Sequence, residues 1–78
     1  MADELSRRIR RVLSQVLDLD SDSIPDELHR ENVDGWDSLN HLRLVTALEE
    51  ELGVRFTMRE VGEMSNLARI REIVEARQ

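Results

Sequence analysis

Residues 34–53 read DGWDSLNHLRLVTALEEELG and contain a helical signal with both of its ends. From Ser38 to Leu52 the apolar residues recur at spacings of three and four, as on a helix with one apolar face. Asp37 has a side chain suited to capping the first turn, and Gly53 is suited to ending the last one. We therefore predict a helix between these two residues and, from its broad apolar face, the most buried helix of the fold. The apolar residues are Leu39, Leu42, Leu44, Val45, Ala47, Leu48 and Leu52.

The segment before this helix, residues 18–37, has no sustained period and contains Pro25 among many Asp and Ser residues. We expect a long loop here. A loop of this length without secondary structure is uncommon in a compact domain unless it has a function. Ile24, Leu28 and Val33 are expected to hold it against the core.

Negative charge is concentrated in this same loop. The chain has 78 residues and a formal net charge of −6, and arginine supplies all its basic side chains because lysine is absent. Such an acidic patch repels nucleic acid and anionic lipid and steers basic partner surfaces toward it. We therefore expect neither nucleic acid nor a membrane as a partner. Arg30 is the one arginine of this loop. Its acidic residues are Asp18, Asp20, Asp22, Asp26, Glu27, Glu31, Asp34 and Asp37.

Further helices are predicted on both sides. From Leu5 to Leu17 apolar residues recur at helical spacing, so we expect an amphipathic helix with a solvated outer face. Thr57 and Glu60 form a capping box, which predicts a short helix ending near Gly62. The outer face of the first helix carries Arg7, Arg8, Arg10 and Arg11.

A last helix follows, capped by Ser65 or Asn66. Its inner side carries Leu67, Ile70, Ile73 and Val74. We find no convincing strand pattern. The sequence therefore predicts an all-α four-helix bundle with a long first loop and a short third helix, in a single domain over residues 1–78.

Composition limits the possible classes of protein. Cysteine is absent, which excludes a disulfide framework, a thiolate metal site and a cysteine nucleophile. The N-terminus lacks the apolar run of a signal peptide, and no stretch approaches the roughly 20 apolar residues that span a bilayer. We expect a cytoplasmic protein that acts as a monomer.

Ser38 stands where the loop meets the helix, and three roles are open to it. It can belong to an ordinary cap, since Asp-Ser is common at helix starts. It could act as a nucleophile with His41, three residues further on, but no glycine-rich oxyanion loop is evident, and we expect a surface role for this histidine. It could also carry a phosphate ester, which the positive end of the helix dipole would stabilise.

A calcium site is a further alternative. Asp18, Asp20 and Asp22 match the first three ligand positions of an EF-hand loop. However, Ser23 stands where glycine is needed, and His29 stands where a bidentate glutamate is needed. We therefore predict no EF-hand and no dedicated metal site, although loose binding of a divalent cation to these carboxylates stays open.

Trp36 is the only tryptophan of the chain. An indole of this kind is ordinarily half-buried, with its N–H group bonded. We expect it to seat the loop on the bundle, and it can in addition contact a partner.

The tripeptide Asp37, Ser38 and Leu39 resembles the attachment motif of acyl carrier proteins and the related peptidyl carrier domains. The resemblance extends along the whole stretch DSLNHLRLVTALEEELGVRF, including the glycine stop, and covers most of the chain, firmly from about Gly35 to Val74. It implies a four-helix carrier protein and not an enzyme.

The resemblance also implies a cofactor and a site. In the family, a phosphopantetheinyl transferase moves 4'-phosphopantetheine from coenzyme A, with magnesium, onto the motif serine, which is Ser38 by position. The thiol of this arm holds acyl or aminoacyl groups as thioesters. The expected partners are this transferase, a loading ligase or transferase, and downstream biosynthetic enzymes. No residue of the carrier itself is expected to be catalytic.

Partner recognition is expected around the motif and along the following helix. Leu39 is the expected exposed apolar anchor, and the acidic loop and Glu49, Glu50 and Glu51 are expected to contact basic enzyme surfaces. The residues predicted to take part are Asp37, Leu39, Trp36, Asn40, His41, Arg43, Glu49 and Glu50.

The sequence departs from fatty-acid carriers at Asn40 and Arg43, where those proteins usually bear acidic residues. Trp36 also replaces a small residue that is common there. A specialised carrier for a polyketide, a modified amino acid or another dedicated pathway is therefore the preferred interpretation. The alternative is an unmodified helical interaction module that binds basic partners through its acidic loop.

Overall fold

The computed structural model describes residues 4–20, 22, 24–25 and 27–77. Over these residues the chain is helical without any strand, which confirms the predicted all-α four-helix bundle. None of the described helices is long and apolar enough to cross a membrane. The elements are α1 (Glu4–Leu17), a 3-10 turn η2 (Arg30–Asn32), α2 (Ser38–Leu52), α3 (Met58–Glu63) and α4 (Leu67–Arg77).

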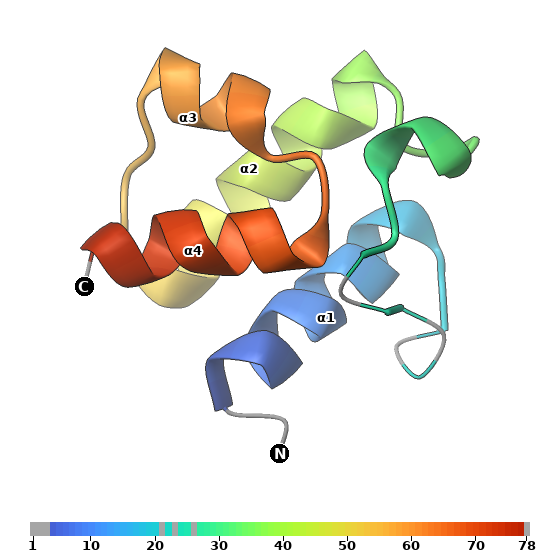
Figure 1. Ribbon diagram of the computed structural model, residues 1–78, viewed down its shortest axis with the longest axis horizontal. Coiled ribbons are helices and arrows are strands. Elements are labelled where there is room, and N and C mark those ends of the chain that lie inside the picture. Colours follow the sequence, from blue (N-terminus) through green and yellow to red (C-terminus); the bar gives the residue numbers. More distant parts are fainter. Residues whose placement is uncertain (1–3, 21, 23, 26, 78) are drawn as a thin grey trace.

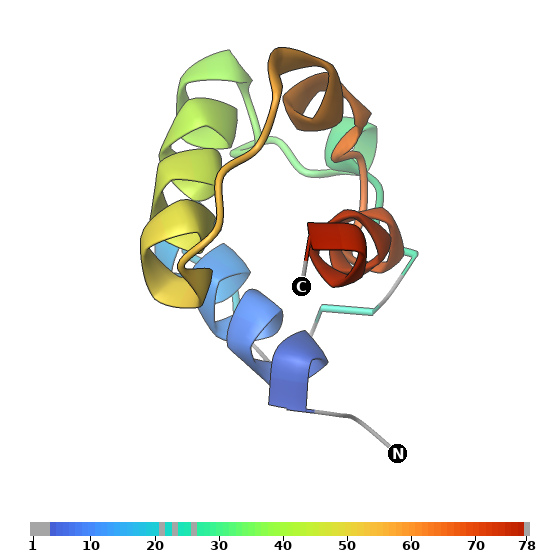
Figure 2. The ribbon, with the colours of Figure 1, turned by 90° about the vertical axis from the view of Figure 1, so that its left-hand side faces the viewer.

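The helices surround one apolar core. Helix α1 packs against both α2 and α4, and α3 packs on α4. Figure 2 shows α2 and α4 on opposite sides of the bundle, with α1 below and α3 near its upper end. The side chains that are buried completely or almost completely in this core are Ile9, Leu13, Leu44, Leu48, Met64, Leu67, Ile70 and Val74.

Local signals set the helix ends where the sequence predicts them. The Asp37 side chain accepts a hydrogen bond from the Asn40 N–H group at 2.8 Å, so it caps α2. Gly53 ends this helix in the left-handed region, with φ of 66°, where a residue with a Cβ atom would be strained. The Thr57–Glu60 capping box is present at the start of α3. Of the two candidate caps for α4, Asn66 is the one that accepts from a helix N–H group, that of Arg69.

The outer face of α1 is less freely solvated than predicted. Arg8 donates to the main-chain oxygen of Glu51 at 2.7 Å, and Arg10 donates to that of Ile24 at 3.0 Å. Arg11 also lies 3.6 Å from the Glu51 carboxylate. These long side chains therefore tie α1 to α2 and to the loop while their stems cover apolar surface.

The long loop, drawn from cyan to green in Figure 1, includes the 3-10 turn η2, which the sequence does not predict. Its anchors are as predicted, since Ile24 is buried and Leu28 and Val33 are partly buried against the core. Between them the chain forms η2, and the Arg30 N–H group donates to the Ser65 carbonyl at 2.7 Å. This bond joins the loop to the turn before α4. Asp26, predicted as part of the acidic patch, lies outside the described residues.

The prediction that α2 is the most buried helix is wrong. Leu39 and Leu42 are each 59% exposed although they belong to its apolar pattern. The reason is that neither α1 nor α4 covers the side of α2 on which they lie, so only part of the broad apolar face reaches the core.

Candidate functional site

Ser38 is the first residue of α2 and lies exposed at the end of the loop. Its hydroxyl makes no hydrogen bond with any residue that the structure describes. The cap of the helix comes instead from Asp37, as predicted. Ser38 is thus left available while its neighbour satisfies the helix N-terminus.

The residues around Ser38 are held by hydrogen bonds. The Asn40 side-chain amide donates to the Gly35 carbonyl at 2.7 Å, which closes the loop onto the first turn of the helix. The Trp36 main-chain N–H group donates to the Val33 carbonyl at 3.0 Å. An exposed serine therefore lies in a well-fixed stretch of backbone.

A chain of two hydrogen bonds, one buried and one partly buried, lies beneath this stretch, and we refer to it as the relay. The Trp36 indole N–H group donates to His41 Nδ1 at 2.9 Å. The other ring nitrogen of this histidine, Nε2, lies 2.7 Å from the Val61 carbonyl of α3. Because Nδ1 accepts, Nε2 carries the proton and donates to that carbonyl, so the relay requires one neutral tautomer of His41.

The relay explains two side chains whose positions the sequence predicts wrongly. His41 is not a surface residue but is 4% exposed, and its ring stacks on Trp36 with centroids 6.2 Å apart. Trp36 is also 4% exposed and not half-buried. The prediction that it seats the loop with its N–H group bonded is confirmed. In this conformation neither ring has surface to offer a partner, so a part in recognition would have to act through the position of α2.

Burial lowers the pKa of the His41 imidazole below its ordinary value of 6.5; the hydrogen bond to Val61 acts in the opposite direction, and the charge of Arg30 adds to the lowering. The imidazole is therefore neutral at neutral pH. Both of its nitrogens are engaged in the relay, so neither can take a proton from the Ser38 hydroxyl. This geometry argues against a serine hydrolase.

The side of α2 that faces away from the core carries an open apolar hollow of about 360 Å³. Leu39 and Leu42 contribute its exposed apolar surface, which confirms that Leu39 is exposed. Arg43 is also exposed and has no hydrogen-bond or ion-pair partner within the described chain. The hollow begins beside Ser38 and is lined by Leu39, Leu42, Arg43, Thr46, Ala47 and Glu50.

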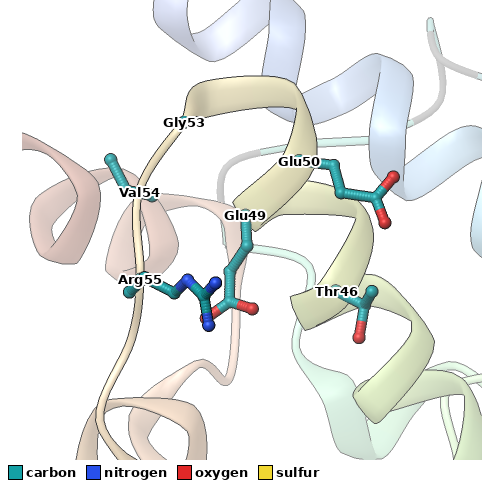
Figure 3. A pocket seen from close by; sticks show the side chains of 6 residues that line it. All are labelled: Thr46, Glu49, Glu50, Gly53, Val54 and Arg55. Carbon is teal, nitrogen blue, oxygen red and sulfur yellow. The ribbon is translucent and has the colours of Figure 1, made fainter.

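A larger hollow of about 530 Å³ lies at the other end of α2. Figure 3 shows the side chains of Glu49 and Arg55 directed into the same space. Glu49, predicted to contact partners, accepts a hydrogen bond from the Phe56 N–H group at 2.9 Å and so holds the chain after the helix. Glu49 lies about 16 Å from Ser38 along the helix, at about 1.5 Å per residue.

The described residues of the acidic loop form no recognisable metal site. Among the residues that the structure describes, no group of three or more His, Cys, Asp or Glu side chains could hold a metal ion. Asp20 accepts a hydrogen bond from the Asp22 N–H group, and His29 accepts one from that of Glu31. Ser23, at the glycine position of the EF-hand pattern, lies outside the described residues.

Two features of the site have no clear signal in the sequence. The Val61 carbonyl is a main-chain atom 20 residues away from His41, so no residue type announces it. Leu42 follows the same helical spacing as the buried leucines, and only the packing of α1 and α4 shows that it is exposed. The pairing of Trp36 with His41 does have a signal: a lone tryptophan needs an acceptor, and a histidine stands five residues away.

Comparisons with known proteins match almost the whole chain. Residues 7–76 match the family described as the phosphopantetheine attachment site. An acyl carrier protein of Treponema denticola is 29% identical over 77 residues, covering 97% of this chain and 97% of that protein. An acyl carrier protein of Saccharopolyspora erythraea is 30% identical over 70 residues, covering 90% of this chain and 74% of that protein.

The family match covers most of the chain, and the two relatives agree with it. Members of this family are carrier proteins and not enzymes, and their prosthetic group is covalently attached 4'-phosphopantetheine. The chain therefore belongs to the acyl carrier protein family.

Proposed function

We propose that Ser38 carries the 4'-phosphopantetheine group and that the protein presents acyl or aminoacyl groups to partner enzymes. The observation that supports this most is the position of Ser38 in the Asp37-Ser38-Leu39 motif. Ser38 is exposed there, and its hydroxyl forms no hydrogen bond with a described residue. The other serines that the structure describes lack this combination; the Ser14 hydroxyl, for example, donates to the Arg11 carbonyl at 2.8 Å.

The surroundings of Ser38 suit a phosphate ester. The serine is the first residue of a helix of 15 residues, whose dipole favours negative charge at this end. Asp37 is the acidic residue adjacent to Ser38 in the sequence, but its carboxylate is bonded to the Asn40 N–H group. The attached group would supply a thiol on a flexible arm, which a protein without cysteine cannot supply itself.

The exposed side of α2 is the proposed contact surface for partner enzymes. Leu39 and Leu42 would insert into an apolar site on the partner, and exposed Glu50 and Arg43 would set the charge that this partner must match. Charges at the rim of such a contact speed encounter without making the complex long-lived. That behaviour suits a carrier that visits several enzymes in turn, since a tethered substrate reaches a high effective concentration at each of them.

Intact mass spectrometry tests the attachment. After incubation with coenzyme A, magnesium and a broad-specificity phosphopantetheinyl transferase, the protein should gain the mass of one phosphopantetheinyl group. Ser38→Ala should abolish the gain. Ser14→Ala, which removes a serine hydroxyl of α1, should leave it intact.

Two results would contradict the proposal. If the wild-type protein gains no mass, the alternative of an unmodified acidic interaction module becomes the better explanation. If Ser38→Ala still gains mass, the group is attached elsewhere.

A further inference from the structure

Trp36 and His41 are the buried residues closest to Ser38 in the sequence, one on each side of it, and the relay connects them. Trp36 precedes the serine by two positions and His41 follows it by three, and the hydrogen bond between their rings is buried. The backbone of Ser38 therefore lies on a short arc whose two ends are joined beneath it. A change in the Trp36–His41 bond must alter the path of this arc.

The relay also anchors this arc to a different helix. The remaining hydrogen bonds described here for residues 35–41 stay within the loop and α2, as those of Asn40 with Gly35 and with Asp37 do. The bond from His41 to the Val61 carbonyl is the one that reaches α3. It fixes where the start of α2 lies relative to the rest of the bundle.

Hydrogen bonding restricts this geometry more than apolar packing would. A hydrogen bond requires a narrow range of distance and angle, whereas two apolar rings can slide past each other at little cost. Each atom in the relay has its partner, so no buried polar group is left over. A leucine and a phenylalanine could fill the same space but would leave the direction of the arc less defined.

We propose that Trp36 and His41 are positioning residues for the modification of Ser38: the relay holds the serine hydroxyl in the orientation in which a phosphopantetheinyl transferase receives it. This inference rests on the proposed function, because it assumes that Ser38 is the modified residue. Neither ring touches the hydroxyl. Their effect is on the backbone that presents it.

Steady-state kinetics of the transferase, with the carrier as the varied substrate, tests the proposal. Trp36→Phe keeps an aromatic ring in the core, removes the N–H donor and leaves a smaller buried side chain, so the loss of packing has to be controlled for. We expect kcat to fall about three- to tenfold, the range set by one hydrogen bond of ordinary net strength. KM should change by less than about twofold, because the exposed surface of α2 is untouched and only the alignment of the hydroxyl is loosened.

Two further comparisons separate positioning from a general loss of stability. Ile70→Val removes one buried methylene from α4 and should weaken the fold without changing kcat. His41→Asn keeps a side-chain acceptor near the indole, whereas His41→Leu keeps none, so the Asn variant should retain more of the wild-type kcat. In NMR spectra of the unmodified protein, Trp36→Phe should shift the amide signal of Ser38, while Ile70→Val should not.

The outcomes are distinct. A wild-type kcat for Trp36→Phe, or an equal loss for Ile70→Val, would overturn the positioning role and leave the attachment at Ser38 intact. A rise in KM alone would overturn it as well, since it would make the relay part of docking. A wild-type protein that gains no mass would remove the proposed function, and this inference with it.

Discussion

The two faces of α2 resemble each other in composition but differ in their surroundings. The inner face places Leu44 and Leu48 at 0% exposure, while the outer face leaves Leu39 and Leu42 at 59%. A leucine that fits the helical spacing is therefore not necessarily buried, because the packing of neighbouring helices determines which leucines are covered. An outer face with adjacent exposed leucines is more typical of a contact surface than of a monomer's ordinary exterior.

The faces differ equally in their polar residues. The inner face buries His41 with both ring nitrogens bonded, whereas the outer face exposes Arg43 with no partner among the described residues. The ring nitrogens of His41 on the inner face are thus used within the protein, whereas the guanidinium of Arg43 on the outer face remains available to a partner. We infer that the inner face determines the fold and the outer face determines the partner.

Removing one leucine from each face is the strongest test of this contrast. Leu48→Ala should lower the free energy of unfolding by about 2–5 kcal/mol, because it opens a cavity in the core. Leu42→Ala should change it by less than about 0.5 kcal/mol. Chemical denaturation measures both values, and similar losses for the two variants would show that the outer face also contributes to the fold.

A smaller effect is expected from the titration of His41. Its pKa in the folded protein lies below the ordinary 6.5, so the unfolded chain binds a proton first as the pH falls. The stability that the neutral imidazole contributes is therefore complete above about pH 6.5 and decreases as the pH falls toward the lowered pKa. Unfolding free energies measured between about pH 7.5 and about pH 5.5 should decline through this window.

The control for this titration is His41→Gln, which has no ionisable side chain at this position. It should be less stable than the wild type at neutral pH and should show a flatter dependence on pH over the same window. The hydrogen bond from Arg77 lowers the pKa of Glu60 below its ordinary value of 4.5, so this carboxylate does not titrate within the window. Parallel curves for the two proteins would mean that another group causes the decline.

The smallest expected effect concerns the outer face. Arg43→Glu extends the acidic surface of α2 and should raise the rate with a fatty-acid synthase partner enzyme about two- to fivefold, the range of a single exposed charge pair. Arg59→Glu makes the same change of net charge on exposed α3 and should have little effect. Equal effects from both variants would assign the result to net charge, and an unchanged or lower rate would show that Arg43 does not select the partner.

The sequence predicts the parts of this structure that depend on neighbouring residues. The bounds of α2 follow from Asp37 and Gly53, because a cap acts within one turn of itself. The start of α3 follows from the Thr57–Glu60 pair for the same reason. Ser38 could be singled out as well, since its motif is contiguous.

The relay and the exposed outer face could not be predicted in the same way. His41 is three residues after the exposed Ser38, a helical spacing that places both on one side of α2 and so suggests a surface position. Its burial depends on Val61, a residue of α3 that is 20 positions away in the sequence. The exposure of Leu42 depends on where α1 and α4 pack. Both features result from long-range contacts, which the local pattern of α2 does not contain.

The bond between Arg8 and α2 has a consequence for protein engineering. Its acceptor is the main-chain oxygen of Glu51, so it persists whatever side chain stands at that position. The additional pairing of the Glu51 carboxylate with Arg11 is partly exposed and contributes little. A designer can therefore change the side chain at position 51 to suit a new partner enzyme, provided that the arginine at position 8 is kept.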